Sequence, residues 1–402
     1  MPLYEGVIYS GDKNIVVLDI GAAYTKCGIA GETGPRCIIP SHIKKDDQIV
    51  KLWDFNNEEE LYENLKEFLF MIYFRHLLVN PKDRRMVISE SLLCPSKFRD
   101  TLARVLFRHF EVGSIMFGTS HLLALTAIGV NTGLVMDVGY TETLLIPVYE
   151  GIPVIKAIQS LPIASQAIHK KLEDQLKEKA TVNTAGGCKP MSSMPDCLNE
   201  QILEDIKVRC CFVTSLERAK QIQEVTVYGA DSNKLPAAVP SVKFPLDGSQ
   251  VLNIDGTIRE HTCEILFEQD NEENSVPTLV LDALLKCPID MRLELADNIV
   301  VTGGTAMLPG FHHRLQLELY DQLKKPKYQN KLVIKKFQFH KLFSKENYTS
   351  WLGGAMYGAL ETLATRSVSR DVYLTAGKLT DWCCIAEEME TEKEEKVKLK
   401  NR

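Results

Sequence analysis

Short apolar runs and amphipathic stretches alternate along most of this chain, which is the pattern of a mixed α/β fold. Apolar runs rich in β-branched residues predict buried strands at 14–20, 27–30, 86–93, 133–138, 143–149 and 298–302. Helical spacing predicts helices at 58–79, 96–110, 120–128, 165–179, 199–209, 276–286 and 311–323, and another beginning near 349. In the helix at 96–110, the spacing places His109 on the buried face together with Phe98, Leu102, Val105 and Leu106.

Three stretches show neither the apolar runs of strands nor the spacing of amphipathic helices. Residues 181–195 and 229–248 carry Gly, Pro and Ser, and they predict irregular loops of an inserted lobe rather than a linker between domains. Residues 387–402 alternate Glu with Lys and contain few apolar residues, so they predict a frayed tail.

One short pattern occurs twice. Residues 16–21 (VVLDIG) are similar to residues 134–139 (LVMDVG). Each copy consists of an apolar strand, an Asp, one apolar residue and a Gly, and each leads into a second strand. Two copies near the starts of two halves of the chain predict an internally duplicated α/β fold.

Composition excludes several classes of protein. The chain has 402 residues, of which 45% are hydrophobic and 25% are charged, as in ordinary globular proteins. Its net charge of −6 gives no general attraction for phosphate backbones, so nucleic acid is not an expected partner. We expect no direct membrane insertion, because no apolar run is long enough to span a bilayer. We expect no secretory signal, because residues 1–10 have no basic region followed by an apolar region. Eleven scattered cysteines without a Cys-x-x-Cys predict reduced thiols of a cytosolic protein, not a zinc site or a disulfide framework.

The two Asp–Gly turns are candidate phosphate and metal sites. Gly21 and Gly139 would let backbone N–H groups approach phosphate oxygens closely. Asp19 and Asp137 would hold a hydrated Mg²⁺ that rides on the phosphates. Two facing copies of this device would clamp a nucleotide between two lobes.

Two further glycine motifs occur late in the chain. At 302–310 (TGGTAMLPG) a strand leads into two glycines and then a helix, which gives flat backbone access for a base or ribose. This motif is neither a P-loop nor a GxGxxG fingerprint. At 351–354 (WLGG) the glycines of a helix allow close packing.

In this order and at these separations, the motifs resemble those of the actin family. The first phosphate loop corresponds to 18–31, the second to 133–139, the adenosine loop to 302–310 and the late helix to 351–354, while 245–248 and 286–292 also fit. The resemblance covers roughly residues 14–384. Within the family, residues 74–85, 264–273 and 381–383 look like the actin-related subunits at the pointed end of dynactin.

The resemblance implies an actin-like two-lobed α/β fold, made of duplicated ribonuclease-H-like domains with a nucleotide cleft. It implies subdomain 1 at 1–40, 60–127 and 349–402, a reduced subdomain 2 at 41–59, subdomain 3 at 128–164 and 275–348, and subdomain 4 at 165–274. The expected cofactor is ATP (or ADP) with Mg²⁺, held through water by Asp19 and Asp137. The residues expected to bind it are Asp19, Gly21, Ala22, Ala23, Tyr24, Lys26, Asp137, Gly139, Tyr140, Thr141, Lys207, Gly303, Gly304, Thr305 and Met307.

The chain departs from the actin pattern around the terminal phosphate. Ala22 and Ala23 replace the Ser and Gly of the first loop, so a hydroxyl is missing and a small side chain is added. Tyr140 and Thr141 replace an Asp and a Gly of the second loop. Lys26 stays in register and could pair with the phosphates.

A second departure concerns hydrolysis. Sliding the actin pattern along the chain puts Ser120 and Leu144 at the positions of the Gln and His that position the attacking water. Neither can orient water as Gln and His would, so we expect no catalytic residues and a nucleotide-binding pseudo-ATPase. Near the adenine, Lys207 is kept but Val208 replaces its usual Glu neighbour.

The resemblance also implies the partners. We expect a non-catalytic subunit that contacts the dynactin filament and the other pointed-end subunits, and indirectly dynein and its cargo, in the cytoplasm and cytoskeleton. Only a short segment at 43–57 remains of the long actin segment that engages a neighbouring subunit, which predicts a cap at the pointed end of the filament. The barbed-end face is expected around Trp351 and at 286–292. The alternatives are an actin-related subunit of a chromatin-remodelling complex, or an actin-fold enzyme such as a weakly active ATPase or a sugar kinase.

Overall fold

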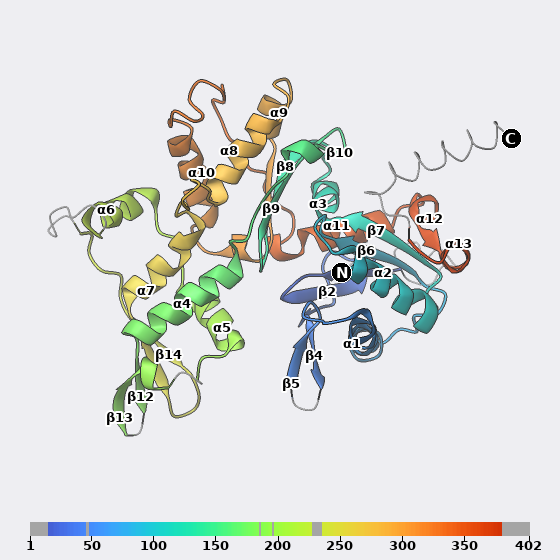
Figure 1. The fold of residues 1–402 in the computed structure, drawn as a ribbon, viewed down its shortest axis with the longest axis horizontal. Coiled ribbons are helices and arrows are strands. Elements are labelled where there is room, and N and C mark those ends of the chain that lie inside the picture. Colours follow the sequence, from blue (N-terminus) through green and yellow to red (C-terminus); the bar gives the residue numbers. More distant parts are fainter. Residues whose placement is uncertain (1–14, 46–47, 185, 195–196, 227–234, 380–402) are drawn as a thin grey trace, which may run out of the picture. The chain divides into compact units, whose positions relative to one another are not determined.

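The computed structural model describes residues 15–45, 48–184, 186–194, 197–226 and 235–379 (Figure 1). Outside these residues lie the motif at 381–383, the neighbouring Cys384 and the expected tail at 387–402. The chain forms two compact units, one made of residues 1–123 and 351–402 and the other of residues 124–350. No helix among the described residues is long and apolar enough to cross a membrane.

The first unit is built on a six-stranded sheet in the order β17-β7-β6-β1-β2-β3. Its strands are β1 (Val16–Ile20), β2 (Tyr24–Ile29), β3 (Cys37–Pro40), β6 (Arg85–Glu90), β7 (Ser114–Thr119) and β17 (Val368–Ser369). The helices include α1 (Glu58–Met71), α2 (Ser96–Arg104), α12 (Leu363–Arg366) and α13 (Arg370–Ala376). Two helices, α3 (Ser120–Ile128) and α11 (Thr349–Gly358), contain the points where the chain passes from one unit to the other.

Both long helices of this unit end in a π-helical turn. The π-helices η1 (Ile72–Leu77) and η2 (Val105–His109) continue α1 and α2. Because a π-turn inserts an extra residue, it shifts the side chains that follow away from the helical spacing of the sequence. His109 is therefore exposed and Phe107 is buried, so the expected placement of His109 was wrong.

The glycine-rich helix packs as expected. A Cβ on Gly353 would lie 1.7 Å from the carbonyl oxygen of Leu123, so α11 and α3 approach more closely than any side chain permits. Trp351 is fully buried and its indole Nε1 donates to the Val17 carbonyl at 3.1 Å. Trp351 itself is therefore a core residue, and the barbed-end face expected around it stays a prediction.

The segment after Pro40 forms a small hairpin. The strands β4 (His42–Lys45) and β5 (Gln48–Lys51) pair antiparallel, with Lys45 opposite Gln48. Ile43 is buried, and Lys45 Nζ donates to Asn64 Oδ1 on α1 at 2.6 Å. The hairpin is thus tied down to its own unit.

The second unit contains two sheets. One has the order β10-β9-β8-β16 with β11 paired to β9, and its strands are β8 (Gly133–Val138), β9 (Thr143–Tyr149), β10 (Ile152–Pro153), β11 (Gln159–Leu161) and β16 (Ile299–Thr302). The other has the order β13-β12-β15-β14, with β12 (Thr181–Thr184), β13 (Gly187–Pro190), β14 (Val242–Pro245) and β15 (Val251–Ile254). The helices are α4 (Ser165–Lys179), α5 (Glu200–Cys210), α6 (Leu216–Thr226), α7 (Gly256–His261), α8 (Val276–Lys286), α9 (Arg292–Ala296) and α10 (Phe311–Gln322).

The prediction of loops was wrong for most of 181–194 and for 242–245, whereas residues 235–241 and 246–248 are irregular, as predicted. The first contains β12, β13 and a 3₁₀ turn (Met191–Ser193), and the second contains β14. These strands are short, and β12 pairs with β15, which lies far along the sequence. Such pairing leaves almost no local signal in the sequence.

The internal duplication is visible in the sheets. β1 pairs antiparallel with β2 and parallel with β6, and β8 pairs antiparallel with β9 and parallel with β16. Asp19 and Asp137 occupy the same place in the two patterns. Their hairpin partners differ, because Asp19 lies opposite Lys26 whereas Asp137 lies opposite Leu144.

Candidate functional site

The first Asp–Gly turn joins β1 to β2. The Gly21 N–H donates to the Tyr24 carbonyl at 3.2 Å, and a Cβ on Gly21 would lie 2.8 Å from that oxygen. Gly21 is required for this close approach and not for a left-handed backbone, since its φ lies outside that region. Ala22, Ala23 and Tyr24 are partly exposed at the turn, where a ligand could reach them.

Ser41 and Trp53 hold the turn by hydrogen bonds to its carbonyl oxygens. Ser41 Oγ donates to the Gly21 carbonyl at 2.7 Å, and the Ser41 N–H donates to the Ala23 carbonyl at 2.9 Å. Trp53 Nε1 also donates to the Gly21 carbonyl, at 3.1 Å, and its ring stacks on Phe98 with centroids 3.9 Å apart. Sequence reasoning missed both supports because they follow the motif at a distance along the chain.

Asp19 and Lys26 form an ion pair beside this turn. Lys26 Nζ lies 3.2 Å from Asp19 Oδ2, and both side chains are largely buried. The structure thus brings together the first-loop residues predicted from the sequence, with one carboxylate and one ammonium in contact. A carboxylate suits a hydrated Mg²⁺, and an ammonium suits a phosphate oxygen.

The second Asp–Gly turn joins β8 to β9 and is linked to the adenosine loop. The Gly139 N–H donates to the Glu142 carbonyl at 3.1 Å, and the Gly139 carbonyl accepts from Thr305 Oγ1 at 2.6 Å. Thr305 is buried and has this structural role, whereas Thr141, Gly304 and Met307 are exposed. Burial raises the pKa of Glu142 above its ordinary value.

Tyr140 is directed away from its own turn. Its hydroxyl donates to a Glu200 carboxylate oxygen, and its ring meets the His169 ring edge-on at 5.7 Å. Its carbonyl accepts from the Gln166 N–H at 2.8 Å. The residue that replaces the second-loop Asp of actin is therefore held by α4 and α5.

Gly303 lies directly against the second turn. Its φ is +98°, and a Cβ would lie 2.2 Å from the Val138 carbonyl oxygen and 2.5 Å from Asp137 Oδ1. Only glycine fits this cradle, which holds backbone close to the carboxylate. Gly304 has open space around its Cα, so a side chain there would meet nothing in this structure.

These neighbours give a matched pair of variants. We expect Gly303→Ala to lower the free energy of unfolding by roughly 3 kcal/mol or more, through backbone strain and the clash with Val138. Gly304→Ala should leave the free energy of unfolding unchanged, because the added methyl group meets no neighbour. It should weaken nucleotide retention, because that methyl group would project from the surface predicted to bind the adenosine. Chemical unfolding and nucleotide release from the purified variants measure the two effects. Equal stability of both variants would contradict this description of the loop.

Lys207 lies in a buried polar cluster between α4 and α5. Its ammonium donates to Ser165 Oγ and, at 2.6 Å, to Glu204 Oε2, while His169 Nε2 lies 2.9 Å from that same carboxylate oxygen. Ser165 in turn donates its N–H to the Gly139 carbonyl at 3.5 Å, which connects Lys207 to the second turn. Burial alone would raise the pKa of Glu204, but His169 and the charge of Lys207 outweigh it and lower the pKa to about 2.

The cluster predicts a pH dependence of stability. Because its folded-state pKa is depressed from 4.5 to about 2, ionised Glu204 stabilises the fold above about pH 4.5, and this contribution is lost as the pH falls toward 2. Its size is roughly 3 kcal/mol at most. Glu204→Gln should therefore destabilise the chain at neutral pH, and its difference from wild type should shrink below about pH 4.5. Unfolding at several pH values tests this, with the exposed Glu178→Gln as the control; a difference independent of pH would contradict it.

The two positions expected to lack a water-positioning side chain are both buried. Ser120 Oγ lies 3.1 Å from His121 Nδ1 at the start of α3. Leu144 is 3% exposed and lies across from Asp137 in the β8–β9 ladder. An aliphatic side chain there can neither accept nor donate a proton.

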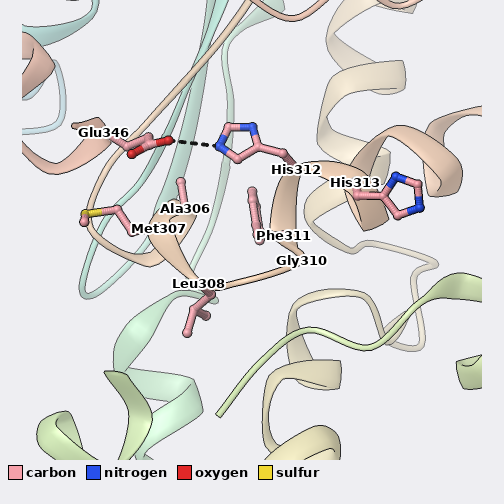
Figure 2. A pocket seen from close by; sticks show the side chains of 8 residues that line it. All are labelled: Ala306, Met307, Leu308, Gly310, Phe311, His312, His313 and Glu346. Carbon is pink, nitrogen blue, oxygen red and sulfur yellow. Dashed lines mark ion pairs between the residues drawn. The ribbon is translucent and has the colours of Figure 1, made fainter. Parts of the chain in front are cut away.

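A pocket of about 370 Å³ opens beside the adenosine loop (Figure 2). His312 Nε2 lies 3.4 Å from Glu346 Oε1 across it, and the His313 ring points away from Glu346. No local sequence pattern indicates the contact between His312 and Glu346, which lie 34 positions apart. The residues lining the pocket are Ala306, Met307, Leu308, Gly310, Phe311, His312, His313 and Glu346.

The Mg²⁺ site expected at Asp19 and Asp137 stays a prediction. Among the described residues, no group of three or more His, Cys, Asp or Glu side chains is placed to bind a metal ion directly. Asp19 and Asp137 belong to different units, and each was expected to bind Mg²⁺ through water.

Comparison with known proteins places the chain in a family. The family profile for actin matches residues 59–380. A Dictyostelium discoideum protein named actin-related protein 10 is 29% identical over 428 aligned positions, which cover 90% of this chain and 86% of that protein. A second protein of that organism, putative actin-29, is 24% identical over 395 positions, covering 91% and 95% of the two chains. Since the profile spans well over half of the residues, this chain belongs to the actin family.

Proposed function

We propose that the chain is a non-catalytic actin-related subunit of dynactin, which caps the pointed end of its actin-related filament and supports dynein-driven transport along microtubules. It acts in the cytoplasm and cytoskeleton through the filament and the other pointed-end subunits, and only indirectly through dynein and cargo. The likeness to an actin-related protein 10 and the stretches at 74–85 and 264–273 support this assignment.

The β4–β5 hairpin carries the proposal. In actin the corresponding segment is long and reaches into the neighbouring subunit. Here the hairpin spans only residues 42–51, and its base is closed by the Leu52 N–H, which donates to the Ser41 carbonyl at 3.1 Å. Ile43 is buried and Lys45 is bound to Asn64, so β4 is held against its own unit. The hairpin is therefore too short to reach a neighbouring subunit. The pointed-end face therefore lacks a main filament contact.

The second unit offers an exposed apolar surface suited to the opposite face. Ile152 on β10, Ile155 in the 3₁₀ turn that follows, Ile289 before α9 and Leu293 on α9 are 58–78% exposed. These elements all contact β9 or its neighbours. Exposed apolar clusters of this kind mark protein interfaces. A heterologous interface with one working face adds to a filament once and then stops its growth.

The nucleotide has a structural role in this proposal. ATP (or ADP) with Mg²⁺ would be held by the predicted first-loop, second-loop and adenosine-loop residues, with Asp19 and Asp137 holding the metal through water. The pocket beside Met307 and Leu308 is large enough for a base. Ligand binding stabilises the native state without hydrolysis. We retain the predicted four subdomains, since the unit boundaries at 123/124 and 350/351 lie close to two predicted edges.

End-labelling of filaments tests the capping activity. Gold-labelled full-length protein added to preformed actin-related filaments should appear in electron micrographs at one end only. Ile289→Asp should abolish this binding, because it places a charge in the exposed apolar surface. Val372→Asp, at another exposed aliphatic residue, on α13, should not. Binding along the filament sides, or at both ends, would contradict the proposal.

A further inference from the structure

Two cysteines face each other beneath the first Asp–Gly turn. Cys27 on β2 lies directly opposite Cys37 on β3 in the antiparallel ladder, and their sulfur atoms are 2.8 Å apart. Cys27 is fully buried, whereas Cys37 is partly exposed. The cysteine pattern of the sequence gave no indication of this pairing, because nine residues separate the two.

The backbone positions suit a disulfide. Directly opposed residues of an antiparallel pair have Cα atoms about 4.5–5.5 Å apart. That separation lies within the range of roughly 4.4–6.8 Å seen in disulfides, whose S–S bond is about 2.05 Å. We infer that Cys27 and Cys37 form a reversible disulfide when the protein meets hydrogen peroxide, which makes this strand pair an oxidative modification site.

The two thiols have different chemical roles. The hydrogen bond with the Cys27 thiol lowers the pKa of Cys37 below its ordinary value, against the opposing effect of burial. The same hydrogen bond and its burial raise the pKa of Cys27. The thiolate is the reactive form of a cysteine, and only Cys37 is partly exposed to a dissolved oxidant, so Cys37 is the nucleophile and the buried Cys27 resolves the intermediate.

The reaction balances with peroxide as the only oxidant. The Cys37 thiolate attacks one peroxide oxygen; an S–O bond forms, the O–O bond breaks and hydroxide leaves, taking up a proton as water. The Cys27 sulfur then attacks the Cys37 sulfur; the S–S bond forms, the S–O bond breaks, and the leaving hydroxide takes up the proton of the Cys27 thiol to become a second water. Two thiols and one hydrogen peroxide become one disulfide and two waters.

The cross-link would act on the first turn. Cys27 follows Lys26, whose ammonium contacts Asp19, and Cys37 lies on the strand that leads to Ser41 beneath Gly21. Joining β2 to β3 would therefore fix the strands that hold this turn, and we expect oxidised protein to unfold at a higher temperature than reduced protein. This inference does not depend on the proposed dynactin role.

Other described cysteines lack this arrangement. Burial raises the pKa of Cys94 and Cys211 to about 12, so neither forms a thiolate readily. Cys188 is exposed and serves as a control for general oxidation. In a reducing cytosol, thiol pairs of this kind are transient and redox-sensing rather than structural.

Peptide mapping tests the inference directly. Full-length protein is titrated with hydrogen peroxide, blocked with N-ethylmaleimide and digested with trypsin without reduction. Trypsin cuts after Lys26, Arg36 and Lys44, so the disulfide should join the peptides 27–36 and 37–44, and dithiothreitol should separate them. Cys37→Ser should abolish the linked species and Cys188→Ser should not.

A second variant separates the steps. In Cys27→Ser, Cys37 should accumulate as a sulfenic acid that dimedone labels, whereas in wild type this label should be weak because Cys27 consumes it. The inference is overturned if peroxide sufficient to oxidise Cys188 leaves peptides 27–36 and 37–44 unlinked in the wild-type protein. It is also overturned if wild-type Cys37 proceeds to sulfinic acid without linking to Cys27.

Discussion

Purified protein in actin-polymerising salt is expected to remain as single subunits. The β4–β5 hairpin is short and is bound to α1 through Lys45 and Asn64, so under the proposed function one of the two faces that a growing filament needs would be missing. Sedimentation and electron microscopy should show no polymer at protein concentrations at which actin assembles completely. Filaments formed by this chain alone would refute the one-faced interface.

A loop graft turns this expectation into a gain of function. Inserting an actin-length loop between β4 and β5 should partly restore pointed-face contacts and allow short oligomers. The same insertion at the tip between β12 and β13 is the matched control, because it adds equal length to another two-stranded turn. If both insertions, or neither, promote assembly, the hairpin is not what limits polymerisation.

Nucleotide retained by the protein is expected to be hydrolysed barely or not at all. Positioned acid–base or water-orienting groups contribute roughly 10²–10⁴-fold to a rate. Here the two expected positions carry Ser120 and a buried leucine, Leu144, which faces Asp137 across the ladder. Phosphate release from protein loaded with ATP and Mg²⁺ should therefore stay near the rate of ATP in buffer.

The reverse substitutions test the cause. Ser120→Gln combined with Leu144→His should raise phosphate release, whereas Leu144→Met, which changes shape but supplies no polar group, should not. Wild-type release at an actin-like rate would contradict the pseudo-ATPase assignment. Loss of all nucleotide on gentle purification would contradict the binding assignment and leave the capping proposal standing.

Local patterns were sufficient for the parts of the fold that position the candidate site. The strand Gly133–Val138 and the helices Ser165–Lys179 and Val276–Lys286 have the bounds that periodicity predicts. The strand and the helix at 276–286 are buried at nearly every residue, whereas the helix at 165–179 is buried along one face that its own sequence defines. The repeated Asp–Gly motif was likewise visible because its strand, carboxylate and glycine are consecutive.

The structural features that the sequence did not predict depend on contacts between residues far apart in the chain or on a change of helical period. β12 forms through its partner β15, and the exposure of His109 follows from the π-turn η2. In the site, the contact of Glu204 with His169 and that of His312 with Glu346 each join residues more than thirty positions apart. No local pattern encodes such contacts, so the sequence could name Lys207 but not the cluster that holds it.

Affinity purification followed by mass spectrometry tests the central claim most directly. The tagged full-length chain, isolated gently from cells, should bring down the dynactin filament subunits and the other pointed-end subunits in one large cytoplasmic complex. Ile289→Asp should lose the filament subunits, and Val372→Asp should keep them. Recovery of chromatin-remodelling subunits without any dynactin subunit would contradict the account.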